Sequence, residues 1–167
     1  KGPIFYSQNR IGKDGKIFKM YKFRSMVMGA DEKLEKYLEE NEDARKEYKI
    51  NKKLKDDPRV TKIGKFIRKT SIDEFPQFVN VLKGDMSLVG PRPYLPREID
   101  DMGSAYPYIT AVKPGITGLW QISGRNNVTF KERLNLDIEY YKRKGIKSDI
   151  KLLGKTVKKV AFKEGAR

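Results

Sequence analysis

Hydrophobic and polar residues alternate loosely over residues 4–25, and this two-residue period is typical of strands. A turn that begins at Gly12 and contains Gly15 divides the stretch in two. Residues 4–10 and 17–24 are therefore predicted to pair as a β-hairpin within residues 4–25.

The pattern becomes helical after the hairpin. Residues 31–50 are rich in Glu, Lys, Leu and Ala, and they predict one charged helix on the surface. The dipeptide Asp57-Pro58 breaks that pattern. Apolar residues then recur at helical spacing, which predicts two helices over residues 60–83.

A long segment rich in proline and glycine follows, over residues 84–128. Residues 93–127 contain four prolines and four glycines, so we expect an irregular loop of the kind that often carries function. Thr129 and Glu132 have the spacing of a capping box and open a final helical region over residues 129–163. The predicted fold class is α+β: one mainly helical domain with an N-terminal β-hairpin and a long irregular Pro/Gly-rich stretch.

The composition adds a strong positive charge and removes several kinds of chemistry. The chain of 167 residues carries a formal net charge of +15, which favours a polyanionic partner such as nucleic acid, an anionic membrane or a phosphate-bearing substrate. It contains no histidine and no cysteine, which excludes imidazole bases, thiol nucleophiles and the usual zinc and iron–sulfur ligands. Acid–base or nucleophilic chemistry would fall to carboxylates, hydroxyls or lysines.

Asp73 and Glu74 are the first candidates for such chemistry. An ionised aspartate is a competent nucleophile towards phosphorus, a neighbouring glutamate can hold a magnesium ion, and nearby Arg68 favours the ionised forms. The alternative is structural, because Ser71 and Glu74 have the spacing of a capping box. Pro76 would clash inside this predicted helix, so the helix either kinks or begins later, with Asp73 near its N-terminus.

Two arginines and one aspartate are further candidates. Arg92 lies between two prolines, which would hold a guanidinium for phosphate, although the motif is equally a rigid turn. Arg125 follows Gly124 in a predicted turn. Asp137 lies at the centre of the apolar stripe of its helix, so it needs a partner, either in a binding site or in a buried structural pair with an arginine.

Two basic regions each allow more than one interpretation. Bases and aromatic residues alternate over residues 19–24, with Lys22 and Arg24 on one face of the predicted strand. This alternation suits a nucleic-acid surface, and it equally suits the amphipathic edge of a hairpin. The basic C-terminal helix is either a packed helix with a solvated lysine face or a surface for anionic lipid.

Eight segments of the chain resemble the bacterial sugar transferases, which are monotopic polyprenyl-phosphate phosphoglycosyl transferases. The resemblance lies in their order and spacing along most of the chain. The segments are Gly2-Pro3-Ile4-Phe5, Gln8-Asn9-Arg10-Ile11-Gly12, Tyr21-Lys22-Phe23-Arg24-Ser25-Met26, Asp57-Pro58-Arg59-Val60-Thr61, Arg68-Lys69-Thr70-Ser71-Ile72-Asp73-Glu74, Ser87-Leu88-Val89-Gly90-Pro91-Arg92-Pro93, Lys113-Pro114-Gly115-Ile116-Thr117-Gly118-Leu119-Trp120-Gln121 and Ser123-Gly124-Arg125-Asn126.

The resemblance implies transfer of a sugar-1-phosphate from a UDP-sugar to polyprenyl (undecaprenyl) phosphate, with release of UMP. It implies that Asp73 attacks the β-phosphorus, that a covalent phosphosugar–aspartate intermediate forms, and that Glu74 binds Mg²⁺. It also implies a set of substrate-binding residues, with Asp137 orienting an arginine. These residues are Lys22, Arg24, Arg68, Arg92, Arg125 and Asp137.

The resemblance further implies a membrane location. In the family, a hydrophobic segment before the Lys-Gly-Pro start dips into the membrane and holds the active site at its cytoplasmic face. The chain begins at Lys1 without that segment, so we expect a fragment of a membrane-anchored parent. The expected partners are a UDP-sugar, polyprenyl phosphate and an anionic membrane surface, and no nucleic acid is expected.

Two hypotheses from other classes compete with this one. A basic nucleic-acid-binding module would explain the net charge and the alternation over residues 19–24. A peripheral scaffold on anionic membranes would use the C-terminal helix without catalysis.

Overall fold

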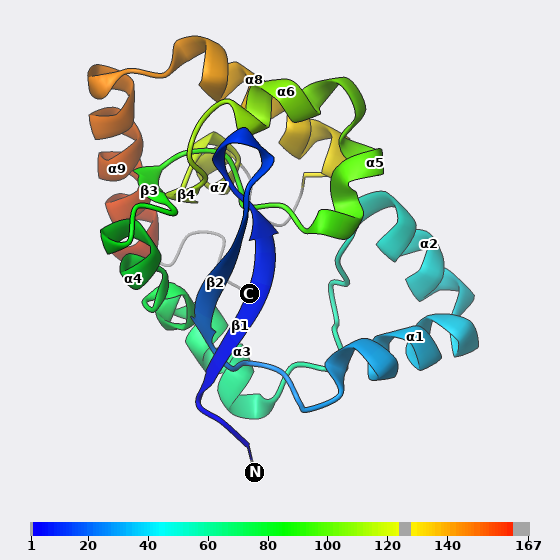
Figure 1. The fold of residues 1–167 in the computed structure, drawn as a ribbon. Helices are drawn as coiled ribbons and strands as arrows, with labels where there is room; N and C mark the ends of the chain where they lie inside the picture. Colours follow the sequence, from blue (N-terminus) through cyan, green and yellow to red (C-terminus); the bar gives the residue numbers. More distant parts are fainter. Residues whose placement is uncertain (1, 124–127, 162–167) are drawn as a thin grey trace.

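The computed structural model describes residues 2–123 and 128–161, the last two of them in backbone only. The described residues form a mainly helical α+β domain, as predicted (Figure 1). With η denoting 3₁₀ helices, the elements are β1 (Phe5–Ile11), η1 (Lys13–Gly15), β2 (Ile17–Phe23), α1 (Ala30–Glu40), α2 (Glu42–Asn51), α3 (Lys62–Lys69), η2 (Ile72–Glu74), α4 (Gln77–Leu82), β3 (Ser87–Val89), η3 (Pro96–Glu98), α5 (Ile99–Met102), η4 (Gly103–Ala105), α6 (Tyr106–Thr110), β4 (Gly115–Thr117), α7 (Leu119–Ser123), α8 (Phe130–Arg143) and α9 (Ile146–Ala161).

The predicted N-terminal hairpin is confirmed, and it runs through the middle of the view in Figure 1. β1 and β2 pair antiparallel, from Phe5 opposite Phe23 to Ile11 opposite Ile17. The turn that joins them holds Gly15 at φ 75°, in the left-handed region that glycine adopts without strain.

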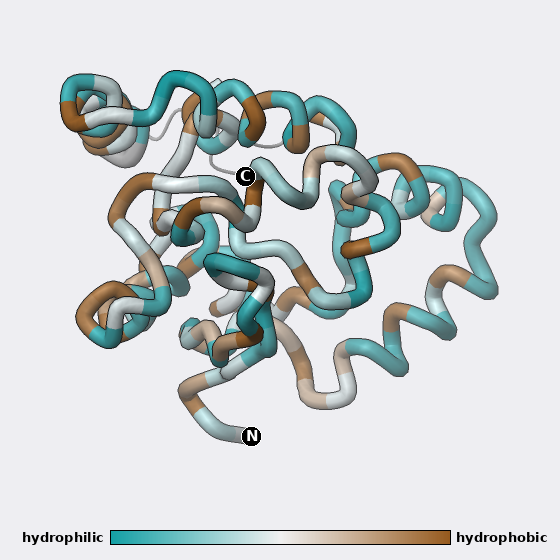
Figure 2. The backbone as a smooth tube through the Cα atoms, turned by 45° about the horizontal axis from the view of Figure 1, so that its top comes forward, coloured by the Kyte–Doolittle hydropathy of each residue, from teal (hydrophilic) through white to brown (hydrophobic). Residues whose placement is uncertain are grey.

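The single charged helix predicted over residues 31–50 is wrong, because the chain forms two helices there. α1 and α2 meet at Asn41, whose backbone is extended and whose side chain donates to the Tyr37 carbonyl (3.0 Å). One straight helix would leave its apolar side without a partner, whereas the two helices bury Leu34 and Ala44 in a small core of their own. Figure 2 shows that the rest of this pair is largely hydrophilic.

Residues 60–83 form α3 and α4, with the turn η2 between them. α3 packs closely on the segment that leaves β2. Gly64 makes this possible, since a Cβ there would clash with the Ser25 carbonyl. The other side of α3 and α4 is apolar but exposed, so helical spacing does not indicate burial in this region.

The segment predicted as an irregular loop over residues 84–128 contains short helices and a two-stranded parallel sheet. β3 and β4 pair with Ser87 opposite Gly115. The strands and helices are each only three to five residues long, which leaves no sequence period to detect. Glycine again permits close packing, because a Cβ on Gly115 would clash with the backbone of Gly90.

Two hydrophobic clusters hold the C-terminal helices on the rest of the domain. The larger joins the end of β1 to α5, α6 and α8, and its buried members are Ile11, Tyr94, Met102, Ala105, Ile109, Phe130 and Leu134. The smaller joins β3, α8 and α9 through Val89, Tyr140 and Leu152. α9 is therefore a packed helix with a basic outer face. Within the described part of the chain, no helix has both the length and the apolar character needed to cross a bilayer.

The close approach of α3 to Ser25 predicts that Gly64→Ala destabilises the domain. The added methyl group would push α3 away from the Ser25 carbonyl, and we expect the free energy of unfolding to fall by about 1–3 kcal/mol. Urea denaturation followed by circular dichroism measures the change. Gly154→Ala in α9 is the matched control, because outside its own helix no described residue has an atom within 4 Å of the added Cβ. This variant should gain about 0.5–1 kcal/mol. Equal effects of the two substitutions would contradict this packing.

Candidate active site

Asp73 lies in η2, the turn between α3 and α4. α3 ends at Lys69, and Ser71 takes a left-handed conformation (φ 58°) that redirects the chain. The Ser71 side chain makes no capping hydrogen bond, so the capping-box alternative is wrong. α4 begins only at Gln77 with Pro76 at its N-cap, which is the later start that a proline at this position requires.

The Asp73 side chain is almost buried, and its charge acts on a half-buried cation, Arg68. Asp73 is 7% exposed, and Arg68 projects from the last turn of α3. Burial lowers the pKa of the Arg68 guanidinium, and the negative charges of Asp73 and Asp57 offset part of that shift. Arginine remains charged at neutral pH after a shift of this kind. The turn therefore presents a carboxylate beside a positive charge, in surroundings with little water.

β2 holds the turn from the other side. Lys22 Nζ pairs with Glu74 Oε1 at 3.1 Å. Asn80, which is fully buried in α4, accepts a hydrogen bond from the Tyr21 amide (3.0 Å) and donates one to the Lys19 carbonyl (2.8 Å). The backbone of β2 is thus hydrogen-bonded to Asn80 of α4, while Lys22 of the same strand forms an ion pair with Glu74 of η2.

Arg24 does not join this group of side chains. Its Nε donates to the Pro3 carbonyl (2.6 Å), so it holds the N-terminal segment. Phe23 stacks on Phe5, with ring centroids 5.3 Å apart. Several bases and aromatic residues of the alternation over residues 19–24 therefore contact other parts of the chain, which weakens the interpretation of this strand as a nucleic-acid surface.

Three cations gather around Arg92, and we call the four side chains Arg10, Lys53, Arg92 and Arg133 the cation cluster. Burial lowers the pKa of Arg10 and of Arg133 to about 10 and that of Lys53 to about 8, and the charge of Arg92 acts on all three in the same direction. The guanidinium groups of Arg92 and Arg133 lie 5.6 and 5.8 Å from the centre of the Trp120 ring. Such crowding of positive charge suits a polyanion such as a diphosphate.

Asp137 is fully buried beside the cation cluster. Its Oδ2 accepts hydrogen bonds from the Tyr94 hydroxyl (2.8 Å) and from the Arg92 backbone amide (3.3 Å). Burial raises the pKa of its carboxyl to about 7, although the two hydrogen bonds and the charges of Arg92 and Arg133 act in the opposite direction. Among the described residues Oδ1 has no hydrogen-bond partner. Asp137 therefore contacts Arg92 through the main chain, and not through a guanidinium–carboxylate pair.

Arg125 lies outside the described residues. Within the described ranges, no group of three or more acidic side chains could hold a metal ion. Asp73 and Glu74 supply two adjacent carboxylates, and Mg²⁺ is typically held by one or two carboxylates together with substrate phosphates. The pair therefore fits a magnesium ion whose coordination a phosphate-bearing substrate completes.

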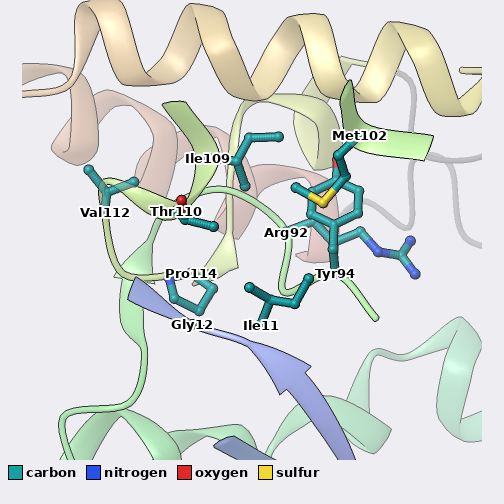
Figure 3. Close-up of a pocket in the computed structure, with 9 residues that line it drawn as sticks. All are labelled: Ile11, Gly12, Arg92, Tyr94, Met102, Ile109, Thr110, Val112 and Pro114. Atoms are coloured by element: carbon teal, nitrogen blue, oxygen red, sulfur yellow. The ribbon is translucent and has the colours of Figure 1, made fainter. Parts of the chain in front are cut away.

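A small cavity lies beside Arg92 but is too small to be the substrate site. Its volume is about 10 Å³, enough for about one water molecule. Figure 3 shows Ile11, Ile109 and Thr110 around this space, while the Arg92 side chain extends away from them. The Arg92 guanidinium thus belongs to the cation cluster and not to the cavity.

Several residues that contact the predicted site residues were not themselves predicted from the sequence. Five of them are Arg10, Lys53, Tyr94, Arg133 and Ser25, whose Oγ accepts a hydrogen bond from Arg68 Nε (2.8 Å). A signal existed for Arg133, because it lies four residues before Asp137 and so shares the buried face of α8. The other four act through segments distant in sequence, where no local pattern identifies them.

Comparison with known proteins identifies a family and several relatives. Residues 1–163 match the family model described as bacterial sugar transferase. The chain is 50% identical over 165 residues to undecaprenyl-phosphate galactose phosphotransferase of Salmonella typhimurium, an alignment that covers 99% of this chain and 35% of that protein. It is 53% identical over 167 residues to galactosyl transferase CpsE of Streptococcus agalactiae serotype III, covering 99% and 36%.

A third relative is UDP-glucose:undecaprenyl-phosphate glucose-1-phosphate transferase of Escherichia coli. It is 39% identical over 164 residues, covering 93% of this chain and 32% of that protein. The chain thus spans about a third of the length of these three relatives.

The raised pKa of Asp137 predicts that stability falls as pH rises. Between about pH 4, where an exposed aspartate loses its proton, and about pH 7, the folded protein keeps a proton that the unfolded chain has lost. The free energy of unfolding should therefore decrease over this range. Asp137→Asn has no proton to lose, so its stability should depend less on pH. Urea denaturation at several pH values from 4 to 7 measures the free energy of unfolding of both proteins. If the two free energies change with pH in the same way, Asp137 does not have a raised pKa.

Proposed function

The chain belongs to the bacterial sugar transferase family, and we propose that it transfers a sugar-1-phosphate from a UDP-sugar to polyprenyl phosphate, with release of UMP. The observation that carries the proposal is the nearly buried Asp73 in a turn between two helices, next to Arg68 and the Lys22–Glu74 pair. Relatives named for phosphotransfer to undecaprenyl phosphate support it.

Asp73 is the proposed nucleophile of the first step. One oxygen of its carboxylate attacks the β-phosphorus of the UDP-sugar. The bond from this phosphorus to the bridging oxygen breaks, and UMP leaves with that oxygen. The sugar-1-phosphate remains bound to Asp73 as an acyl phosphate. A carboxylate must here approach a diphosphate of the same sign, so nearby cations and exact orientation are required.

In the second step an oxygen of polyprenyl phosphate attacks the same phosphorus. The bond between phosphorus and Asp73 breaks, which restores the carboxylate and gives a polyprenyl-diphosphate sugar. Both attacking groups are ionised oxygens that carry no proton to remove. This mechanism therefore needs no imidazole base, which fits a chain that contains no histidine.

Two groups of cations would offset the negative charge of the substrates. Arg68 lies by Asp73, where the phosphorus reacts, and we assign the nucleotide end of the donor to the cation cluster around Arg92. We assign Mg²⁺ to Glu74 together with Asp73, and a bound ion there would neutralise charge on the diphosphate. Lys22 holds the Glu74 carboxylate against β2.

An exposed apolar surface on α3, on α4 and on the turn between them fits an anionic membrane. Its members, which we call the α3–α4 apolar face, are Ile63, Phe66, Phe75, Phe78, Val79 and Leu82. Exposed lysines of the same region, Lys62, Lys65, Lys69 and Lys83, suit anionic lipid headgroups. Docking of this face would bring Asp73 to the surface where polyprenyl phosphate presents its headgroup. We propose the cytoplasmic face of the bacterial cell membrane as that surface.

Asp73→Asn should lower the rate of UMP release by about 10³-fold or more, because a carboxamide cannot form the acyl phosphate. The assay uses the full-length protein in membranes, a panel of UDP-sugars and polyprenyl phosphate. A donor labelled in its β-phosphate should leave label on the wild type but not on the variant. Asp100→Asn, at an exposed position in α5, is the matched control and should behave as wild type. Unchanged turnover in Asp73→Asn would remove the proposed nucleophile.

Phe66→Ser combined with Leu82→Ser should weaken binding to vesicles that contain anionic phospholipid by about 10-fold or more, since each exposed side chain loses its apolar contact with the bilayer. Vesicle sedimentation measures the binding. The control pair is Met28→Ser with Ile50→Ser, whose side chains are similarly exposed (61% and 59%) but lie outside the α3–α4 apolar face. Equal loss in both pairs would argue against docking through this face.

A further inference from the structure

We propose that Ser25 is a positioning residue for Arg68, an inference that rests on the function proposed above. Ser25 is buried just after β2, and its Oγ accepts a hydrogen bond from Arg68 Nε (2.8 Å). This contact uses only the Nε nitrogen of the Arg68 guanidinium group. The contact therefore leaves Nη1 and Nη2 for Asp73 or for a substrate phosphate.

Ser25 is itself fixed by the backbone around it. Its carbonyl accepts a hydrogen bond from the Thr61 amide (3.1 Å), and Gly64 packs directly on the same oxygen. Two residues further on, the Val27 amide donates to the Arg59 carbonyl (2.9 Å). A hydroxyl attached to such a segment has little freedom to follow Arg68 if the arginine moves.

The spacing along α3 explains how one serine reaches both ends of the helix. Thr61, Gly64 and Arg68 are separated by three and four residues, so they share one face of the helix. Ser25 contacts the start of that face through its carbonyl and the end through its hydroxyl. The position of α3 and the orientation of Arg68 are therefore set by the same residue.

Among the carboxylates around Arg68, Asp73 acts on it most strongly, while Asp57 is hydrogen-bonded to Arg59. Arg59 is held by Asp57 through two hydrogen bonds of 2.8 and 2.6 Å. The strongest opposing charge on Arg68 is that of Asp73, followed by that of Asp57. A free arginine side chain samples many rotamers, and fixing Nε removes most of them before a substrate binds. Ser25 would in this way orient the guanidinium for the reacting phosphorus.

Ser25→Ala should lower kcat/KM for the UDP-sugar by about 10- to 100-fold, with the larger part of the loss in kcat. Because the substitution removes one oxygen and adds no bulk, the melting temperature should change little. Ser25→Thr keeps the hydroxyl and should recover part of the lost kcat. Wild-type kcat/KM in Ser25→Ala, measured on an active full-length protein, would overturn the inference.

Arg68→Lys shows whether Ser25 acts by orienting the Arg68 guanidinium or only by packing in the fold. Lysine has no guanidinium Nε–H, so Ser25→Ala should cause no further loss of kcat in that background. Thr61→Ala is the structural control, since it removes the N-cap hydrogen bond to the Gly64 amide (2.9 Å) and the long contact of its hydroxyl with the Ser25 carbonyl (3.4 Å). It leaves the hydrogen bond between Arg68 Nε and the Ser25 hydroxyl in place. Its effect should be the same in both backgrounds. Additive losses from Ser25→Ala and Arg68→Lys would also overturn the inference.

The Arg68 Nε–H resonance in a proton–nitrogen NMR spectrum tests the contact without catalysis. It should exchange slowly with solvent in the wild type and rapidly in Ser25→Ala. If this proton exchanges equally fast in the wild type and in Ser25→Ala while the wild type is active, the role of Ser25 is overturned and the proposed function is not. A protein with a protected resonance and no transfer activity would overturn the proposed function and, with it, the role given to Ser25.

Discussion

The outer edge of β2 is the constraint on which the candidate active site depends. A strand in a two-stranded sheet has backbone groups on one side that no other strand satisfies. Asn80 satisfies two of them, the Tyr21 amide and the Lys19 carbonyl, and so fixes α4 where a third strand would lie. Lys22 of the same strand then reaches Glu74. A small hairpin, which would be marginally stable alone, becomes the support against which the turn that carries Asp73 is held.

The charged side chains of the candidate site form two groups, which differ in how far carboxylates offset the positive charge. Near η2 two cations each have a carboxylate nearby: Lys22 contacts Glu74, and the charge of Asp73 acts on Arg68. In the cation cluster, repulsion between the positive charges adds to burial in lowering the pKa values of Arg10, Lys53 and Arg133. The first arrangement suits a nucleophile that must stay ionised and fixed, whereas the second suits a multiply charged ligand. This division supports a donor that places its reacting phosphorus in one group and its nucleotide in the other.

The sequence predicted the parts of the fold that repeat over several residues. Alternation and a glycine turn predicted the hairpin, and the absence of histidine and cysteine directed attention to Asp73. The break at Asn41 was missed because the pairing of Leu34 with Ala44 is a tertiary contact, and a run of Glu and Lys favours a helix on either side of it. The short elements of residues 84–128 were missed because none lasts long enough to show a period. The link between Ser25 and Arg68 spans 43 residues, so it leaves no trace in local sequence.

The proposed nucleophile and an exposed aromatic ring are two residues apart in this chain. Asp73 is nearly buried while Phe75 is more than half exposed, and Phe78 packs edge-on against it with ring centroids 6.3 Å apart. If these rings enter a bilayer, the Asp73 carboxylate lies at a fixed height above the lipid tails. A phosphate attached directly to a hydrocarbon chain would then be within its reach. Acceptors would then be sorted by how deep their phosphate lies in the membrane. The far end of the hydrocarbon would never meet the protein, so tails of different length would be handled alike.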